Sequence, residues 1–179
     1  MDRPPNDQPR VRLRDVTLAD ADLLDSWEEH RSEFNDFGTP REPVDRDVLA
    51  KGPMRNERNG MLIVELVDGA RPIGSVGWHL ERYGPNPESN ALNFGIELIP
   101  EARGKGYGTE AQAQLVAYLF ATTEINRVEA GTDIDNLPEQ RSLEKAGLRR
   151  EGVMRGSQFR RGAYRDLVVY GIVRADLEA

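Results

Sequence analysis

The stretch from Ile96 to Ala113 constrains the chain most, because it reads as a strand, a glycine loop and a helix start in direct succession. An apolar run ends at Pro100, glycines follow at positions 104, 106 and 108, and a helical pattern extends from about Thr109 to Ala121. A loop of this kind and the first turn of a helix present unpaired backbone N–H groups, to which the helix dipole adds partial positive charge. Glycine allows the backbone to approach an anion closely. The stretch therefore predicts a binding site for a phosphate-like group.

Composition excludes several other classes of protein. The 179 residues carry a net charge of −7, which argues against wholesale binding of nucleic acid. There are no cysteines and only two histidines, so disulfides, thiolate nucleophiles and a metal site of cysteines or several histidines are not expected. No apolar run is long enough to cross a bilayer, and no apolar segment follows Met1. We expect a cytoplasmic protein that uses no membrane and no metal.

The order of predicted elements indicates one domain. Residues 1–9 are polar and rich in proline and read as a disordered leader, whereas residues 10–175 show no linker and no internal repeat. The order is strand, helices, three strands in a meander, helix, strand, helix and a final hairpin. It predicts an α+β (α/β/α) fold with a mixed, mostly antiparallel sheet of about six to seven strands and helices on both faces. The expected strands are 10–16, 61–67, 72–80, 90–99, 127–134, 148–159 and 163–173, and the expected helices are 18–30, 44–50, 109–121 and 139–146.

Two well-known phosphate loops fit the glycine stretch poorly. The nucleotide-hydrolase loop requires Ser or Thr after Gly-Lys, but Gly104-Lys105 is followed by Gly106, and Ile99 stands where its first glycine belongs. A dinucleotide-binding fingerprint matches only formally, and its glycines would have to follow the strand at once. A nucleotide-dependent oxidoreductase is therefore a distant alternative.

A third pattern fits better. The run from Arg103 to Gly108 resembles the Arg/Gln-x-x-Gly-x-Gly/Ala pyrophosphate loop of the GNAT superfamily of N-acetyltransferases. Downstream, Asn136 and the run from Leu143 to Leu148 resemble the asparagine and the Leu-Glu-Lys-x-Gly-Phe pattern of that family. The run Arg150-Glu151-Gly152 with Arg155, and Gly162-x-Tyr164-x-Asp166 with Tyr170, resemble the RimJ/RimL type, which acetylates protein N-terminal amines.

The resemblance implies acetyl-CoA as the cofactor. Backbone groups at Leu98 and Ile99 would pair with the pantetheine, and the amide at Leu98 would polarise the thioester carbonyl. Asn136 would reach the pantetheine, although a cap of the next helix is the alternative. The residues implied at the pyrophosphate are Arg103, Gly104, Lys105, Gly106, Tyr107, Gly108 and Thr109.

The catalytic groups are less well defined. Acyl transfer to an amine needs no enzyme nucleophile, but a carboxylate or a histidine can act as general base, directly or through water. Glu97 is our first candidate for base or amine orienter, and a solvent-facing strand glutamate is the alternative. The tyrosine acid of many family members is replaced by Leu143. Glu139 stands where RimL-type members often have serine; it is a second candidate, or simply an acidic residue in a first helical turn.

The acceptor is expected to be a primary amine, either a protein N-terminus or a small molecule. Trp27, Trp78 and His79 are candidates to line its pocket, although aromatic residues at such positions are often simply core. A homodimer is plausible for a RimL-like chain. Another acyl donor with the same fold, or a non-catalytic CoA-binding module, remains an alternative function.

Overall fold

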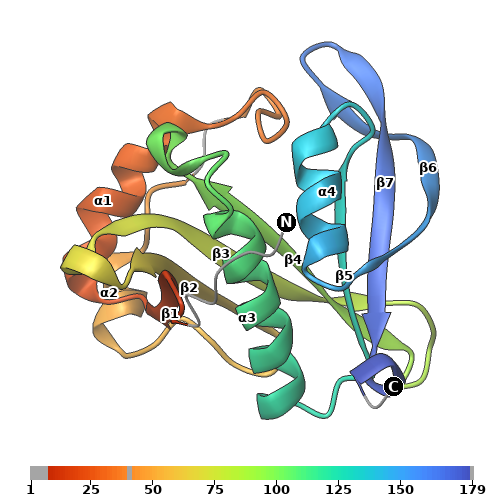
Figure 1. Cartoon of the computed structure of the whole chain (residues 1–179), viewed down its shortest axis with the longest axis horizontal. Coiled ribbons are helices and arrows are strands. Elements are labelled where there is room, and N and C mark those ends of the chain that lie inside the picture. The colour runs from red at the N-terminus through yellow and green to blue at the C-terminus, as the bar shows by residue number, and fades with distance from the viewer. Residues whose placement is uncertain (1–7, 40–41, 178–179) are drawn as a thin grey trace, which may run out of the picture.

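A mixed sheet of seven strands runs through the protein, and a computed structural model describes residues 8–39 and 42–177. The strands lie in the order β1-β2-β3-β4-β5-β7-β6. Each neighbouring pair is antiparallel except β4 and β5, which run parallel. The expected α+β fold is therefore confirmed (Figure 1). The strands are β1 (Val11–Asp15), β2 (Asn59–Leu66), β3 (Pro72–Arg82), β4 (Asn90–Leu98), β5 (Arg127–Asp133), β6 (Arg149–Arg160) and β7 (Ala163–Val173).

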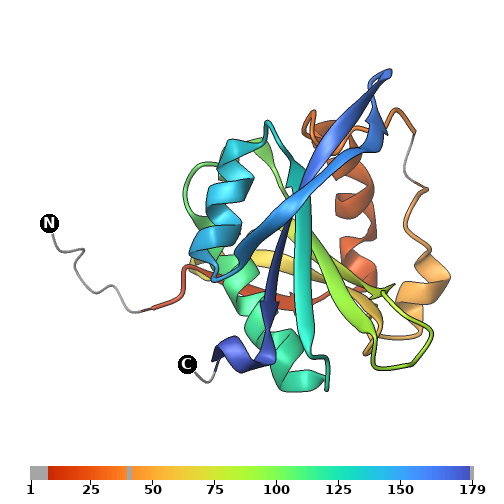
Figure 2. The ribbon, with the colours of Figure 1, turned by 90° about the vertical axis from the view of Figure 1, so that its right-hand side faces the viewer.

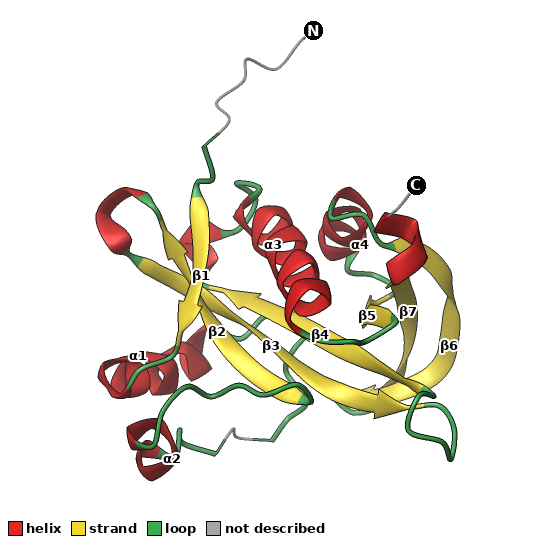
Figure 3. Cartoon of the chain, turned by 90° about the horizontal axis from the view of Figure 1, so that it is seen from below, coloured by secondary structure: helices red, strands yellow, loops and turns green. Residues whose placement is uncertain are grey.

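Helices cover both faces of this sheet. Figure 3 shows α1 and α2 on the side of the sheet opposite to α3 and α4. The α-helices are α1 (Ala21–Ser26), α2 (Arg46–Ala50), α3 (Tyr107–Thr122) and α4 (Leu137–Lys145). Short 3₁₀ turns, η1 (Leu18–Asp20) and η2 (Trp27–His30), flank α1 and divide the helix expected over 18–30. Thr17 and Asp20 form a capping box at the start of η1.

Helix α3 lies in the hydrophobic core. Its residues Ala111, Leu115 and Leu119 are fully buried and share one face, in keeping with the helical pattern expected from the sequence. The helix packs on the sheet, where the Trp78 and Tyr118 rings meet edge to face with centroids 5.9 Å apart. This packing fixes the position of the glycine loop, because the loop joins the end of β4 directly to the start of α3.

The sheet opens between its two parallel strands. Strands β4 and β5 pair only at Leu92–Val128, Asn93–Glu129 and Phe94–Ala130. Beyond Phe94, β4 continues to Leu98 alongside β3, while β5 continues to Asp133 alongside β7. Over its last four residues, β4 therefore has no strand paired to the edge that faces β5.

The chain ends in a long hairpin of β6 and β7, which extends past the body of the sheet (Figure 2). The chain turns between these strands at Arg161 and Gly162, with φ of +51° and +79°. No helix in the described residues is long and apolar enough to cross a membrane. The predicted leader falls largely on residues 1–7, which lie outside the described part of the chain.

Candidate active site

A cleft of about 1120 Å³ occupies the opening between β4 and β5. Its walls come from the facing strand ends, the glycine loop, the starts of α3 and α4, and residues 31–35. These segments lie far apart in the sequence, and they meet around the space left where the pairing of β4 and β5 stops. The cleft is large enough for a ligand of the size of a cofactor.

The glycine loop forms one end of the cleft. Gly104 and Gly106 have φ of +72° and +81°, which non-glycine residues rarely adopt, and both line the cleft. Gly106 is the N-cap of α3, so the amides of the first turn have no acceptor within the helix. No other described residue accepts a hydrogen bond from the amides of Tyr107, Gly108 or Thr109. The loop thus has the unpaired amides and the positive-φ glycines on which the predicted anion site depends.

The back of this loop is pinned by Arg10. Its guanidinium donates to the Lys105 carbonyl at 3.0 Å, lies over the Tyr107 ring at 5.0 Å, and pairs with Glu110 at 3.2 Å. Neither Lys105 nor Tyr107 lines the cleft, in contrast to their glycine neighbours. In the structure as it stands, these two residues contribute backbone to the loop and place their side chains outside the cleft.

Arg103 lines the cleft but is engaged with the backbone. Its Nε donates to the Leu98 carbonyl at 2.8 Å, and one Nη donates to the His30 carbonyl at 2.6 Å. The guanidinium therefore joins the end of β4 to the end of η2. It brings positive charge to the cleft while holding two of its walls together.

The free edge of β4 presents the backbone of alternate residues. The Ile99 amide donates to the Ile73 carbonyl of the β3 segment at 2.9 Å. In an antiparallel pair the next residue points its amide and carbonyl the other way. Leu98 and Ile96 therefore face the opening, and both line the cleft. The backbone of Leu98 is thus available to a ligand, as expected. The amide of Ile99 is not, because it bonds to β3 and the residue is buried. Ile96, and not Ile99, is therefore the second residue whose backbone faces the opening.

Asn136 is the N-cap of α4, which is the alternative role expected for it, and it also lies at the cleft. Its Oδ1 accepts from the Glu139 amide at 3.4 Å as the N-cap, and its Nδ2 donates to Thr132 Oγ1 at 3.0 Å. Asn136 and Thr132 both line the cleft. The cap thus fixes the start of α4 beside the end of β5.

Glu139 also lines the cleft, but it faces α3. Its Oε1 accepts from Nε2 of the fully buried Gln112 at 2.5 Å. Burial raises the pKa of Glu139 to about 7, against the opposing effect of the hydrogen bond from Gln112. A carboxylate with such a pKa can take up a proton at neutral pH.

Glu97 lies on β4 and is half-buried in the wall of the cleft. It is the neighbour of Leu98, whose amide faces the opening. This places a carboxylate beside the edge of β4, as expected from the sequence, whereas a fully solvated strand glutamate would not line the cleft.

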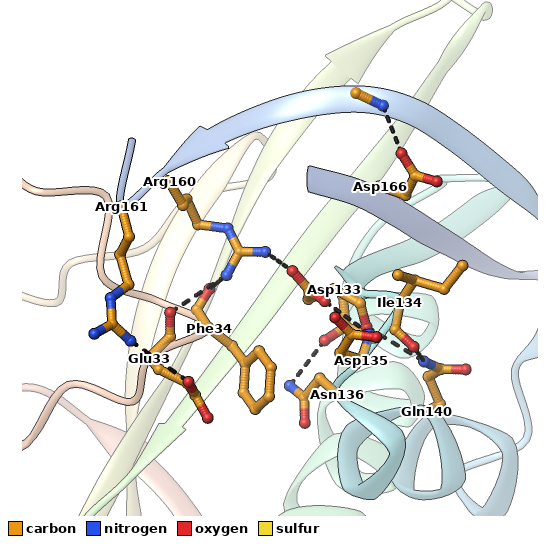
Figure 4. Close-up of polar contacts among 12 residues, drawn as sticks. Glu33, Phe34, Asp133, Ile134, Asp135, Asn136, Gln140, Arg160, Arg161 and Asp166 are labelled. Carbon is orange, nitrogen blue, oxygen red and sulfur yellow. Dashed lines mark hydrogen bonds and ion pairs between the residues drawn. The ribbon is translucent and has the colours of Figure 1, made fainter. Parts of the chain in front are cut away.

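The wall formed by residues 31–35 is held by a buried ion pair (Figure 4). Arg160, on β6, pairs with Asp133, at the end of β5, and donates to the Phe34 carbonyl at 2.8 Å. Arg161 makes a longer contact of 3.5 Å with the exposed carboxylate of Glu33. The end of the hairpin therefore positions the cleft wall that comes from the N-terminal third of the chain.

Comparisons with known proteins agree with this geometry. Residues 10–149 match the family described as Acetyltransferase (GNAT) domain. The chain belongs to the GNAT acetyltransferase family. Its predicted activity as an acyl-CoA-dependent N-acetyltransferase and its predicted use of acetyl-CoA are therefore confirmed at the level of the family.

The GNAT relatives of this chain carry names that indicate different acceptors or none. The putative ribosomal N-acetyltransferase YdaF of Bacillus subtilis is 31% identical over 168 residues, which are 93% of this chain and 87% of that protein. The uncharacterized N-acetyltransferase YoaA of the same organism is 31% identical over 111 residues, or 62% of this chain and only 60% of YoaA. The spermidine N-acetyltransferase of Vibrio cholerae, solved with CoA and spermine, superposes with a TM-score of 0.77 at 19% identity and covers 96% and 100% of the two chains.

Three residues expected at the acceptor of this GNAT protein lie elsewhere. Trp27 and Trp78 are buried in the core, where Trp78 faces α3 and Tyr118. His79 is mostly exposed and lies 3.7 Å from Glu81. None of the three lines the cleft. For the two tryptophans the alternative of a core position holds, because aromatic character marks burial as readily as a ligand pocket.

Leu143, which stands at the position of the family tyrosine, is fully buried in the core and does not line the cleft.

Several residues in and behind the GNAT cleft escaped the sequence analysis. Ser142 and Gln112 join α3 to α4, and Ile96 faces the opening. Gln112 was detectable in principle, because it is a polar residue among the apolar positions of α3, next to Ala111. Arg160 carries no such signal, since Asp133 is 27 residues away in sequence.

Proposed function

We propose that this protein transfers an acetyl group from acetyl-CoA to a primary amine by direct attack in a ternary complex. The observation that carries the proposal is the opening of the sheet, which places the bare edge of β4 and the unpaired amides of α3 in one cleft. A CoA molecule needs both features, because it combines an extended amide-containing arm with a pyrophosphate.

The donor would lie along the opening. The backbone of Ile96 and Leu98 is suited to pair with the pantetheine arm as an added strand, and the amides at Gly104 to Thr109 are suited to the pyrophosphate. The Leu98 amide is suited to stabilise the charge that develops on the thioester oxygen. Arg103 adds positive charge next to this position. No cysteine nucleophile is available, which agrees with direct attack by the amine.

The amine must be neutral when it attacks, so it must lose a proton. Glu97 is our first candidate to orient the amine and accept that proton, because it lies beside Leu98 on the cleft wall. Glu139 is the second candidate, because its pKa of about 7 suits a base at neutral pH. A tyrosine acid is not available at position 143, so the leaving thiolate would be protonated by another group or by water.

The names of the relatives suggest two acceptor classes. YdaF is named for ribosomal acetylation, and the protein from Vibrio cholerae is named for spermidine. A protein N-terminus and a small polyamine both offer a primary amine. Cytoplasmic action and a homodimer remain predictions from the sequence.

The test measures release of CoA thiol from acetyl-CoA with a panel of peptides and small amines. The protein contains no cysteine, so a thiol-reactive dye reports the product without a background from the enzyme. We expect amine-dependent release, and stabilisation of the fold by about 2.7 kcal/mol at a donor concentration 100 times its Kd. Stabilisation without release would favour a non-catalytic CoA-binding module, and absence of both would refute the proposal.

A matched pair of glycine variants tests the location of the donor. Gly104→Glu and Gly162→Glu both replace a glycine of φ above +70° around which an added Cβ meets nothing within 4 Å. The backbone cost is therefore similar, but only Gly104 lines the cleft. We expect Gly104→Glu to abolish donor binding and Gly162→Glu to preserve it. Equal binding by the two variants would place the donor elsewhere.

A further inference from the structure

Four polar side chains form a chain of hydrogen bonds between α3 and α4. Thr109 Oγ1 lies 2.9 Å from Ser142 Oγ, Ser142 Oγ lies 2.8 Å from Gln112 Oε1, and Gln112 Nε2 lies 2.5 Å from Glu139 Oε1. Gln112 is fully buried, whereas Thr109, Ser142 and Glu139 line the cleft. The buried amide of Gln112 therefore links Glu139 to the hydroxyl pair of Ser142 and Thr109 at another point of the cleft wall.

The direction of each hydrogen bond follows from the chemistry of the groups. An ionised carboxylate only accepts, so Gln112 must turn its NH₂ group to Glu139 and its carbonyl to Ser142. Ser142 then gives its single proton to Gln112, which leaves its oxygen to accept from Thr109. The hydroxyl proton of Thr109 is thus committed to Ser142. Toward the cleft, Thr109 offers only lone pairs, which repel an anion.

The same four groups are equally satisfied in the reverse direction. A protonated Glu139 can donate to the carbonyl of Gln112 once the amide has turned over. Gln112 then donates to Ser142, and Ser142 donates to Thr109. The hydroxyl proton of Thr109 becomes free to point into the cleft. One proton forms one O–H bond on Glu139, and every other change is a rotation that exchanges a donor for an acceptor.

We propose that Thr109, Ser142, Gln112 and Glu139 act as a reversible hydrogen-bond chain that couples protonation of Glu139 to the binding of an anionic ligand at the first turn of α3. When Glu139 takes up a proton, Thr109 changes from a hydrogen-bond acceptor to a donor toward the ligand. The inference rests on the proposed function, which places the pyrophosphate of the donor at this turn. Ser142 and Gln112 are positioning residues, because they act through Thr109.

The surroundings of Glu139 assign the titration to this residue. Burial dominates its shift in pKa, and Glu139 forms no ion pair with any residue in the described part of the chain. Neither histidine lines the cleft, and His79 lies beside Glu81. The charged side chains that line the same cleft are Arg31, Glu33, Glu97, Arg103, Arg141 and Lys145.

The experiment measures binding of dephospho-CoA by calorimetry from pH 6 to pH 8. This probe keeps the pyrophosphate but lacks the 3′-phosphate, whose own ionisation near pH 6 would obscure the result. Buffers of different ionisation enthalpy count the protons exchanged. For the wild-type protein we expect uptake of part of a proton near pH 7 and binding about tenfold tighter at pH 6 than at pH 8, since one hydrogen bond to a charged group is gained.

Three variants separate the coupling from simple damage to the site. In Ser142→Ala the hydroxyl of Thr109 loses its acceptor, so we expect tight binding at both pH values. In Thr109→Val the hydroxyl is absent, so we expect weak binding at both. Thr109→Ser retains the hydroxyl and should restore the dependence on pH. A pH dependence in Ser142→Ala as large as in the wild-type protein would overturn the proposal.

A measurement without ligand keeps the test independent of the proposed function. The side-chain amide resonance of Gln112 should shift with a midpoint near pH 7, and this shift should be lost in Glu139→Gln. A resonance that does not move with pH would overturn the reversal of the chain. A resonance that moves in a protein that acetyl-CoA does not stabilise and that releases no CoA thiol would support the reversal but refute the proposed function.

Discussion

Arg160 and Asp133 form an ion pair that is almost closed to solvent, since their side chains are 3% and 4% exposed. The pair joins the end of the β6–β7 hairpin to the end of β5, and the same guanidinium donates to the Phe34 carbonyl at 2.8 Å. The buried guanidinium of Arg160 thus joins the cleft wall of residues 31–35 to the end of β5. Loss of a single partner should cost far more than the net stabilisation of the pair, because the other charge would remain buried.

Asp133→Asn should lower the free energy of unfolding by about 3–5 kcal/mol, because it leaves Arg160 buried without a counter-charge. Denaturation with urea measures the loss. Glu33→Gln is the control, because it breaks the exposed contact with Arg161 and should cost at most about 1 kcal/mol. Similar small losses in both variants would show that solvent reaches Arg160.

Alanine substitutions at two neighbouring glycines should have opposite effects on the protein without ligand. Gly106→Ala places a Cβ at φ +81° and 3.1 Å from Arg10, so it should destabilise by about 1–2 kcal/mol. Gly108→Ala lies inside α3 with its nearest neighbour at 3.5 Å, so it should stabilise by about 0.5–1 kcal/mol. Thermal denaturation of the two variants checks the difference, and a loss of stability in Gly108→Ala would contradict the expected fit.

Glu139 should make the stability of the unliganded protein fall as pH rises. Its pKa is about 7 in the folded state and 4.5 in the reference state, so the native protein binds a proton between these values that the unfolded chain has lost. The contribution is fully present below pH 4.5 and is lost as pH rises through 7, by at most about 3 kcal/mol. The difference in unfolding free energy between the wild-type protein and Glu139→Gln measures it. Two parallel profiles would be inconsistent with the shift, and the exposed Glu124→Gln controls for the loss of one carboxylate.

Leu143→Tyr should not supply the tyrosine that many family members have at this position. Leu143 is fully buried in the core, so the larger side chain should destabilise the protein by about 1–3 kcal/mol through overpacking. Thiol release at saturating acetyl-CoA should not rise above that of the wild-type protein. A faster rate with an unchanged stability would show that the ring reaches the cleft.

The sequence predicts those features that local pattern encodes. The glycine spacing after a strand marks the loop at Gly104 and Gly106, and the order of elements predicts the sheet. The helical pattern after the glycines marks α3, although the helix begins two residues earlier than expected. Each of these signals lies within a few residues of the structure that it specifies.

The features that escape prediction depend on contacts across the chain. A tryptophan at position 78 reads the same in the sequence whether its side chain faces α3 or a ligand. Which face it points to depends on the register of β3 in the sheet. Ile99 looks equivalent to Leu98 until its amide is seen to bond to Ile73. The ion pair of Arg160 and the hydrogen bonds of Gln112 join elements whose proximity follows from the topology of the whole sheet.

The short pairing of β4 with β5 has a consequence for how such a protein can change over time. The donor would be gripped by main-chain groups of β4 and of the α3 loop, and most side-chain substitutions leave these groups in place. An acceptor that meets the other walls of the cleft, such as that of residues 31–35, would be contacted mainly by side chains. New acceptor preferences could then arise by mutation of one wall while the hold on the donor is inherited unchanged.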